Sequence, residues 1–188
     1  MSASTVISDV TLTLEELLKS EQRPANSFDV SLKSPAEEEI QQGKPKVNLF
    51  LYRVAENPFG RNVDRQAIGP DALEYPPLFL HLFFLLTPFA EDKLDELRVF
   101  GEAMRVLHDN SIVGGASLKG GLEKTNEELR VELCPFTLEQ LAQIWNALDK
   151  PYRLSVCYEL RTAFIDSLIT TPVSRVLEVD NEFSQVVR

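Results

Sequence analysis

The sequence predicts a single α+β (α/β) domain in which about three helices pack on a mixed, mostly antiparallel β-sheet. Segments with helical periodicity alternate along the chain with strand-like apolar runs, and this order is typical of helices packed on a sheet. The chain has 188 residues, 44% of them hydrophobic and 26% charged. This size and composition are those of one soluble globular domain with a core of its own.

The N-terminal third predicts one helix and one short strand. Apolar residues fall on one helical face between about residues 5 and 20, and they are Ile7, Val10, Leu14, Leu17 and Leu18. Residues 28–32 alternate between apolar and polar, as a half-exposed strand does. Residues 34–45 contain three consecutive glutamates, Gly43 and two prolines, which predicts a solvated loop.

The middle of the chain predicts two buried strands separated by a long irregular segment. Residues 47–54 are apolar on both faces, which favours a central place in the sheet. Residues 55–77 are rich in proline, glycine and asparagine, and loops of this length are commonly functional. Residues 78–87 are almost wholly apolar and predict the second strand.

The second half predicts two helices and two or three further strands. The first helix carries an apolar pattern of Leu94, Leu97, Phe100, Gly101, Met104 and Leu107. Residues 110–122 are loop-like, and residues 128–134 alternate as a strand does. Thr137 and Gln140 form a capping box that opens a helix burying Leu138, Leu141, Trp145 and Leu148. Residues 154–165 predict a long antiparallel strand.

The end of the chain predicts an additional strand followed by a tail. We expect residues 1–170 to form a single domain and residues 171–188 to form a C-terminal strand and tail.

Charge and targeting signals exclude several classes of partner. The 19 basic and 29 acidic side chains give a net charge of −10, which argues against nucleic acid and anionic membrane as main partners. The N-terminus does not have the pattern of a signal peptide. The longest uncharged run, Tyr75–Ala90, contains three prolines and is shorter than the ~20 residues that span a bilayer. We therefore expect a cytoplasmic protein without direct membrane insertion, whose Cys134 and Cys157 are free and buried or neighbours on adjacent strands.

The sequence lacks the residue patterns of common catalytic and metal sites. His81 lies within a predicted strand, where a satisfied core histidine is the favoured interpretation, and His108 ends a helix, where a capping role is favoured. Neither has the spacing of a metal ligand pair. The Gly115–Gly121 segment lacks the Lys-Ser/Thr of a phosphate-binding loop. We expect no catalytic residue, no cofactor and no metal.

Five segments in one order carry a family resemblance. They are Lys44–Asn62, Pro76–Thr87, Gly101–Asp109, Leu138–Trp145 and Tyr152–Glu159. With these spacings the chain resembles the tail-terminator family of extracellular contractile injection systems, of the antifeeding-prophage and virulence-cassette type. The resemblance runs from about Val6 to Leu177, and it implies a phage tail-terminator-like fold.

The resemblance also implies a structural role without chemistry. Family members form a six-fold ring on the distal end of the inner tube, stop its growth and join the last sheath ring. The implied partners are further copies of the chain in a homohexamer, the inner tube protein and the sheath protein, within an assembled particle. Two alternatives remain: a baseplate or other adaptor of the same particle, and a small-ligand-binding domain.

Two segments are candidates for the assembly interface. The 55–77 segment offers Asn57, Arg61, Asn62, Asp64 and Arg65, and the alternative is a solvated loop. The C-terminal segment offers Val173, Val176 and Val179 for pairing with a sheet of the sheath or of a neighbour. For that segment the alternative is an edge strand within its own chain.

Overall fold

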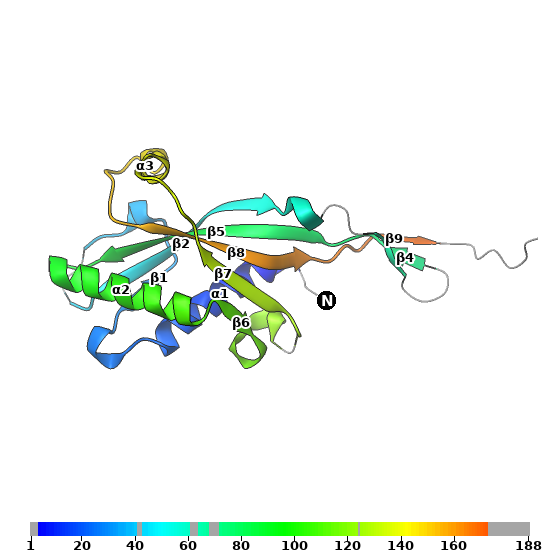
Figure 1. Ribbon diagram of the computed structural model, residues 1–188, viewed down its shortest axis with the longest axis horizontal. Coiled ribbons are helices and arrows are strands. Elements are labelled where there is room, and N and C mark those ends of the chain that lie inside the picture. The colour runs from blue at the N-terminus through cyan, green and yellow to red at the C-terminus, as the bar shows by residue number, and fades with distance from the viewer. Residues whose placement is uncertain (1–3, 41–42, 61–63, 68–71, 124, 173–188) are drawn as a thin grey trace, which may run out of the picture.

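The computed structural model describes residues 4–40, 43–60, 64–67, 72–123 and 125–172 (Figure 1). Three α-helices lie in this part of the chain: α1 (Val6–Ser20), α2 (Lys93–Asp109) and α3 (Leu138–Ala147). Short 3-10 turns include η1 (Pro24–Asn26), η2 (Pro35–Glu37) and η3 (Pro58–Gly60). The three helices and the mixed, mostly antiparallel sheet confirm the predicted fold class.

The main sheet has six strands in the order β1-β2-β5-β8-β7-β6. Its strands are β1 (Asp29–Ser31), β2 (Lys46–Glu56), β5 (Leu78–Phe89), β6 (Ile112–Gly114), β7 (Glu128–Leu133) and β8 (Val156–Ile165). The β1–β2 pair is parallel, and every other neighbouring pair in this sheet is antiparallel. The two long inner strands, β5 and β8, therefore form the middle of the sheet.

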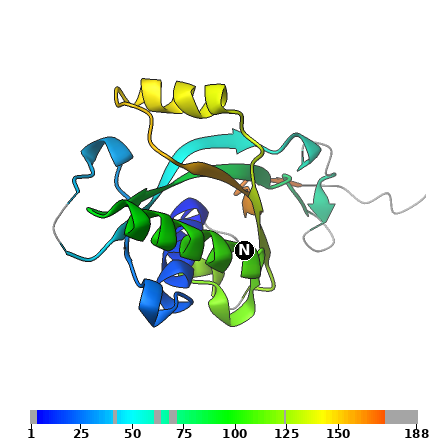
Figure 2. The same cartoon turned by 60° about the vertical axis from the view of Figure 1, so that its left-hand side comes forward.

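Helices α1 and α2 lie on one face of this sheet and enclose the main core (Figure 2). Strand β5 contributes alternate residues to it, namely Leu80, Leu82, Phe84 and Leu86, as the two-residue period of a strand requires. In α1, the Thr11 and Thr13 hydroxyls donate to the carbonyls of Ile7 and Asp9 one turn earlier, at 2.8 and 2.7 Å. Packing against the sheet holds this threonine-containing helix in place.

Helix α3 lies on the opposite face of the sheet and has a small core of its own (Figures 1 and 2). Leu85 of β5 packs there with Leu141 and Trp145. The predicted capping box is present, because the Thr137 hydroxyl accepts from the Gln140 amide and the Gln140 side chain accepts from the Thr137 amide. The sequence therefore fixes the start of α3 locally.

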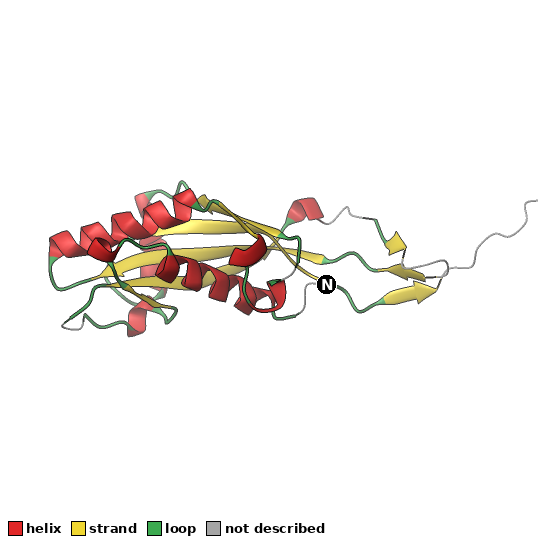
Figure 3. Cartoon of the chain, turned by 90° about the horizontal axis from the view of Figure 1, so that it is seen from below, coloured by secondary structure: helices red, strands yellow, loops and turns green. Residues whose placement is uncertain are grey.

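A second, three-stranded sheet projects beyond the main sheet (Figure 3). It consists of β3 (Gln66–Ala67), β4 (Ala72–Glu74) and β9 (Thr170–Pro172), in the order β3-β4-β9, all antiparallel. We call these three strands the extension. Two of them fall inside the 55–77 segment that the sequence predicts as irregular, so that part of the prediction is wrong.

Three other sequence expectations also need correction. Strand β2 is not central, since β1 pairs only with its first three residues, 46–48. Ile112–Gly114 forms the short strand β6 within a stretch expected to be loop. Leu138 was expected to be buried by α3, but it is 62% exposed because it lies at the first helical position, away from the sheet.

The buried face of helix α2 is only partly the one predicted. Phe100 and Leu107 are buried and Met104 packs against the core as expected, but Leu94 and Leu97 are 62% and 44% exposed and Gly101 faces open space. The buried face also includes Val99, Ala103 and Val106, and two glutamates, Glu96 and Glu102. The buried glutamates accept hydrogen bonds from lysine or arginine, which offsets the cost of their burial.

Candidate assembly interface

Asn57 is fixed to the main sheet just after β2 ends. Its amide donates to the Phe79 carbonyl at 2.8 Å, and its own carbonyl accepts from the Gly60 amide at 3.1 Å. A Cβ at Gly60 would overlap the ring of Phe79, so glycine permits this turn to lie against β5. Asn57 thus belongs to a turn whose backbone is bonded to β5.

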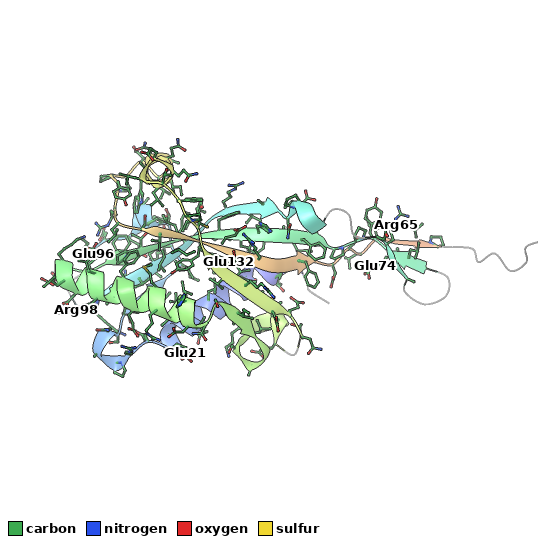
Figure 4. The ribbon with its side chains drawn as sticks, viewed as in Figure 1. Glu21, Arg65, Glu74, Glu96, Arg98 and Glu132 are labelled. Atoms are coloured by element: carbon green, nitrogen blue, oxygen red, sulfur yellow. The ribbon has the colours of Figure 1, made fainter. Side chains whose placement is uncertain are left out.

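Asp64 and Arg65 are exposed, and they lead into the extension. The Arg65 guanidinium carbon lies 4.8 Å from the centre of the Tyr75 ring, which is a cation–π contact across the extension. Figure 4 shows Arg65 and Glu74 together in this projecting part of the molecule. Arg65 therefore presents a positive charge whose position is set by Tyr75.

The remaining candidates lie outside the described residues. They are Arg61, Asn62, Val173, Val176 and Val179. The structure brings Asn57, Asp64 and Arg65 to one end of the molecule, and the assembly role of all eight residues stays a prediction.

Exposed apolar side chains gather where the extension leaves the main sheet, and we call them the extension patch. Tyr75, Leu78, Leu168 and Ile169 are 44%, 46%, 98% and 60% exposed. The Tyr75 amide donates to the Ile169 carbonyl at 3.0 Å, and Leu78 pairs with the end of β8. Exposed apolar groups that cluster in this way are typical of protein interaction sites. The signal in the sequence was the Leu168-Ile169 pair among polar neighbours, which the sequence analysis did not single out.

A second candidate surface is a groove between β2 and α3. It has a volume of about 480 Å³ and is lined mainly by Phe50 and Tyr52 from the strand and by Phe136, Ile144 and Leu148 from α3 and its flanks. Arg53, Gln140, Gln143 and Ala147 complete its rim. The sequence pattern does not show this groove, because its two walls are about ninety residues apart in the chain.

Strand β2 offers an open edge beside this groove. Its pairing with β1 stops at Asn48, although β2 continues to Glu56. Within the described part of the chain, no strand pairs with this outer edge beyond Asn48. An open strand edge next to an apolar groove is the geometry that accepts an added strand.

Polar contacts on the same face of the sheet fix the side chains near the groove. Tyr52 and Cys157 are joined by a hydrogen bond of 2.9 Å, and burial together with this bond raises the pKa of the Tyr52 hydroxyl. The Arg53 guanidinium lies over the Phe83 ring at 4.9 Å. Next to it, His81 Nδ1 lies 2.6 Å from the Glu159 carboxylate. The strand wall of the groove is therefore held in place before any partner binds.

The two cysteines are free, and they meet at the junction of β7 and β8. Cys157 is buried and Cys134 is half-buried, and the Cys134 amide donates to the Cys157 carbonyl at 2.8 Å. The expectation of neighbours on adjacent strands is therefore confirmed, and burial is complete only for Cys157.

In the residues that the structure describes, no group of three or more His, Cys, Asp or Glu side chains is placed to hold a metal ion. Among those same residues, no helix has the length and apolar character needed to span a membrane. The extension patch and the β2–α3 groove are the candidate surfaces for assembly contacts.

A sequence model of the Pvc16 N-terminal domain matches residues 9–178. The chain belongs to this family. The match spans nearly the same residues as the resemblance noted from the sequence, and it confirms that resemblance. A search of curated proteins gave no match.

Solved structures share the fold of this Pvc16 N-terminal domain. One is the sheath/tube terminator of an extracellular contractile injection system, PVC, in the extended state, with a TM-score of 0.70 and 18% identity over 100% of this chain. Another is the tube-terminating cap of the anti-feeding prophage, with a TM-score of 0.67 and 16% identity over 94% of this chain. The domain spans 66% and 61% of the lengths of those two proteins.

Proposed function

We propose that this chain is the structural cap, or tail terminator, of a phage-tail-like contractile injection system. It forms a homohexameric ring on the distal end of the inner tube, ends tube growth and anchors the last sheath ring. The observation that carries the proposal is the fold match over the whole chain to a protein described as a sheath/tube terminator. The family match supports the same role.

A terminator needs contacts with the inner tube, with the sheath and with its own neighbours in the ring, and the molecule has two exposed surfaces suited to such contacts. A tube grows through head-to-tail contacts that do not close along its axis, so a cap must bind the last tube ring and offer no further docking face. Laterally, each subunit must contact its neighbours to close the ring. The extension, with its apolar patch and Arg65, and the β2–α3 groove are two separate surfaces for such contacts.

The role requires no catalysis and no cofactor. The chain acts as one component of a particle assembled in the cytoplasm, with the tube protein and the sheath protein as partners. One solved relative is described as the sheath/tube terminator of an extracellular contractile injection system and the other as a tube-terminating cap, and both descriptions support a role as a particle component.

Loss of the gene should change particle length. Without a terminator, we expect overlong and uneven tubes whose sheath is missing or slips, because nothing ends growth or fixes the last sheath ring. Electron microscopy of particles from the deletion strain measures this directly. Capped particles of uniform length would contradict the proposal, and a label found at the baseplate end would favour the adaptor alternative.

Charge removal on the candidate interface should weaken assembly. Replacing Arg61 and Arg65 with Ala is expected to weaken ring formation or tube binding about thirtyfold, since each lost charged contact at an interface costs on the order of 1 kcal/mol. Lys19→Ala with Arg98→Ala is the matched control, because these two cations are exposed at 43% and 64% and lie on α1 and α2. Equal assembly of both double variants would exclude the arginines from the interface.

A further inference from the structure

We propose that the groove between β2 and α3 binds the C-terminal segment Val173–Asp180 of a second copy of this chain. The segment would add a strand to the open edge of β2. This inference deepens the proposed function, because it supplies the lateral contact that a ring needs.

The groove has the two features that recognition of an extended segment requires. Beyond Asn48, the described chain places no strand on the outer edge of β2, so its backbone can extend the sheet by one strand. Phe50, Tyr52 and Ile144 line the adjoining space of about 480 Å³, which can receive alternate side chains of the added strand. Backbone hydrogen bonds supply affinity in this mode of binding, and the side-chain pockets supply specificity.

The C-terminal segment has the composition that such a groove selects. It reads Val-Ser-Arg-Val-Leu-Glu-Val-Asp, and in an extended conformation three apolar residues, Val173, Leu177 and Val179, share one face with Arg175. β-branched residues favour the strand conformation. Glu178 and Asp180 would lie on the other face, and Arg53 at the rim of the groove is an exposed cation that complements their charge.

The position of β9 favours a neighbour as the acceptor. Strand β9 ends at Pro172 in the projecting extension, at the other end of the molecule from α3 (Figures 1 and 2), and α3 forms one wall of the groove. Residues 173–188, extended at ~3.3 Å per residue, span about 50 Å beyond that point. A segment of this length that starts far from its own groove is long enough to reach the groove of a neighbouring copy.

The contact is heterologous, because the donor segment and the acceptor groove are different surfaces of one chain. Repetition of such a contact produces a ring when the rotation closes. Because the two surfaces are different, one variant can be made without the C-terminal donor segment and another without the acceptor groove.

Variants of the full chain separate the two surfaces. Ala147→Arg fills the groove from an exposed rim position, and Asn146→Arg adds the same charge one residue away, outside the groove lining. Leu177→Asp with Val179→Asp disables the donor, and Ser184→Asp with Gln185→Asp adds the same charge further along. Circular dichroism and the melting temperature check that each variant is folded.

Sedimentation velocity over a micromolar concentration series measures self-association. We expect the wild type and both control variants to associate, and the groove and donor variants each to lose at least about tenfold in affinity, as for central interface residues. An equimolar mixture of the groove and donor variants should form 1:1 dimers and nothing larger, because only one donor and one acceptor remain intact.

Three results would overturn the inference. These are a wild type that stays monomeric, a groove variant that associates as the wild type does, and a mixture that does not pair. If the groove variant still associates, the groove does not bind the C-terminal segment of a second copy. A segment of another protein, such as the sheath protein, would then be the candidate for binding there. The isolated chain is used throughout, so these results are independent of the particle-length experiment that tests the proposed function.

Discussion

Replacing Glu102 with Gln is expected to destabilise the protein by about 2 kcal/mol at neutral pH, because it removes a buried charge that holds two parts of the chain together. The Glu102 side chain is 3% exposed. Its carboxylate accepts from the Arg105 guanidinium at 2.7 Å and from the Arg23 amide at 2.8 Å. The Asn26 side-chain amide also donates to the Glu102 carboxylate at 3.5 Å, so Glu102 helps to join helix α2 to the segment that follows α1, together with Arg105, which donates to the Glu21 carbonyl at 2.8 Å.

The contribution of Glu102 to stability should be lost at low pH. Hydrogen bonding from Arg105 lowers the pKa of Glu102 from 4.5 to about 2, against the opposing effect of burial. A group whose pKa is lower in the folded state stabilises that state above its unfolded pKa. The contribution of Glu102 is therefore complete above about pH 5 and is lost as the pH falls from 4.5 to about 2.

Urea unfolding of the wild type and Glu102→Gln at several pH values measures this difference. We expect a gap of about 2 kcal/mol at pH 7, equivalent to roughly 4–8 °C in melting temperature for a domain of this size, which narrows below about pH 4. Glu16→Gln is the control, since Glu16 is 45% exposed and forms only a surface pair with Lys19. A gap that is absent at pH 7, or constant with pH, would show that the buried charge is not stabilising.

Local signals in the sequence predicted the elements whose structure is decided locally. The capping box at Thr137 and Gln140 starts α3 where expected, because both hydrogen bonds lie within four residues. The apolar face of α1 was also correct, with Val10, Leu14 and Leu17 buried. In both cases the periodicity of the sequence is itself the physical cause of the structure.

The sequence did not predict features decided by distant partners. Strand β6 has three residues, and it exists because Ile112–Gly114 pairs with β7. Strand β4 pairs with β9 about one hundred residues later, so the extension has no local signature. Leu94 and Leu97 continue a helical pattern yet remain exposed, while Glu102 is buried because Arg105 and Arg23 lie opposite it.

The sequence likewise predicted only the part of the candidate interface that has a local signal. The 55–77 segment was selected by its length and composition, and it does lead into the exposed extension. The groove joins Phe50 and Tyr52 to Ile144, and their proximity depends on how α3 folds back over the sheet. Tertiary packing brings the residues of such a surface together, so they have no characteristic spacing in the sequence by which the surface could be predicted.

Replacing Trp145 with Ala is expected to release α3 from the sheet at a cost of about 3–5 kcal/mol, the usual range for a buried aromatic residue changed to alanine. Trp145 is 1% exposed and is the largest side chain of the small core beneath α3. Its indole Nε1 donates to the Ser155 hydroxyl at 3.0 Å, and Ser155 is itself 2% exposed. Among the described residues, Leu85 and Leu141 share its buried core, and the other apolar side chains packed against this core are only partly buried: Tyr52, Phe136, Ile144 and Leu148.

We expect the Trp145→Ala variant to lose structure in α3 before the rest of the domain unfolds. The main core under α1 and α2 does not include Trp145, so β5 and β8 should keep their protection when α3 opens. Hydrogen exchange of Trp145→Ala is expected to show fast exchange in α3 and near-normal exchange in β5. Trp145→Phe is the matched variant that keeps most of the apolar volume, and Ser155→Ala should cost about 1–3 kcal/mol by leaving the indole N–H unpaired.

The Trp145→Ala variant tests stability and assembly together, because α3 forms one wall of the groove. If the groove binds a neighbour's C-terminal segment, Trp145→Ala should lose self-association along with α3 protection, whereas Trp145→Phe should keep both. Glu102→Gln, which acts on the opposite face of the sheet, should lower stability without changing self-association. Association that survives the release of α3 would place the lateral contact elsewhere, and equal exchange in α3 and β5 would show that the two cores unfold as one unit.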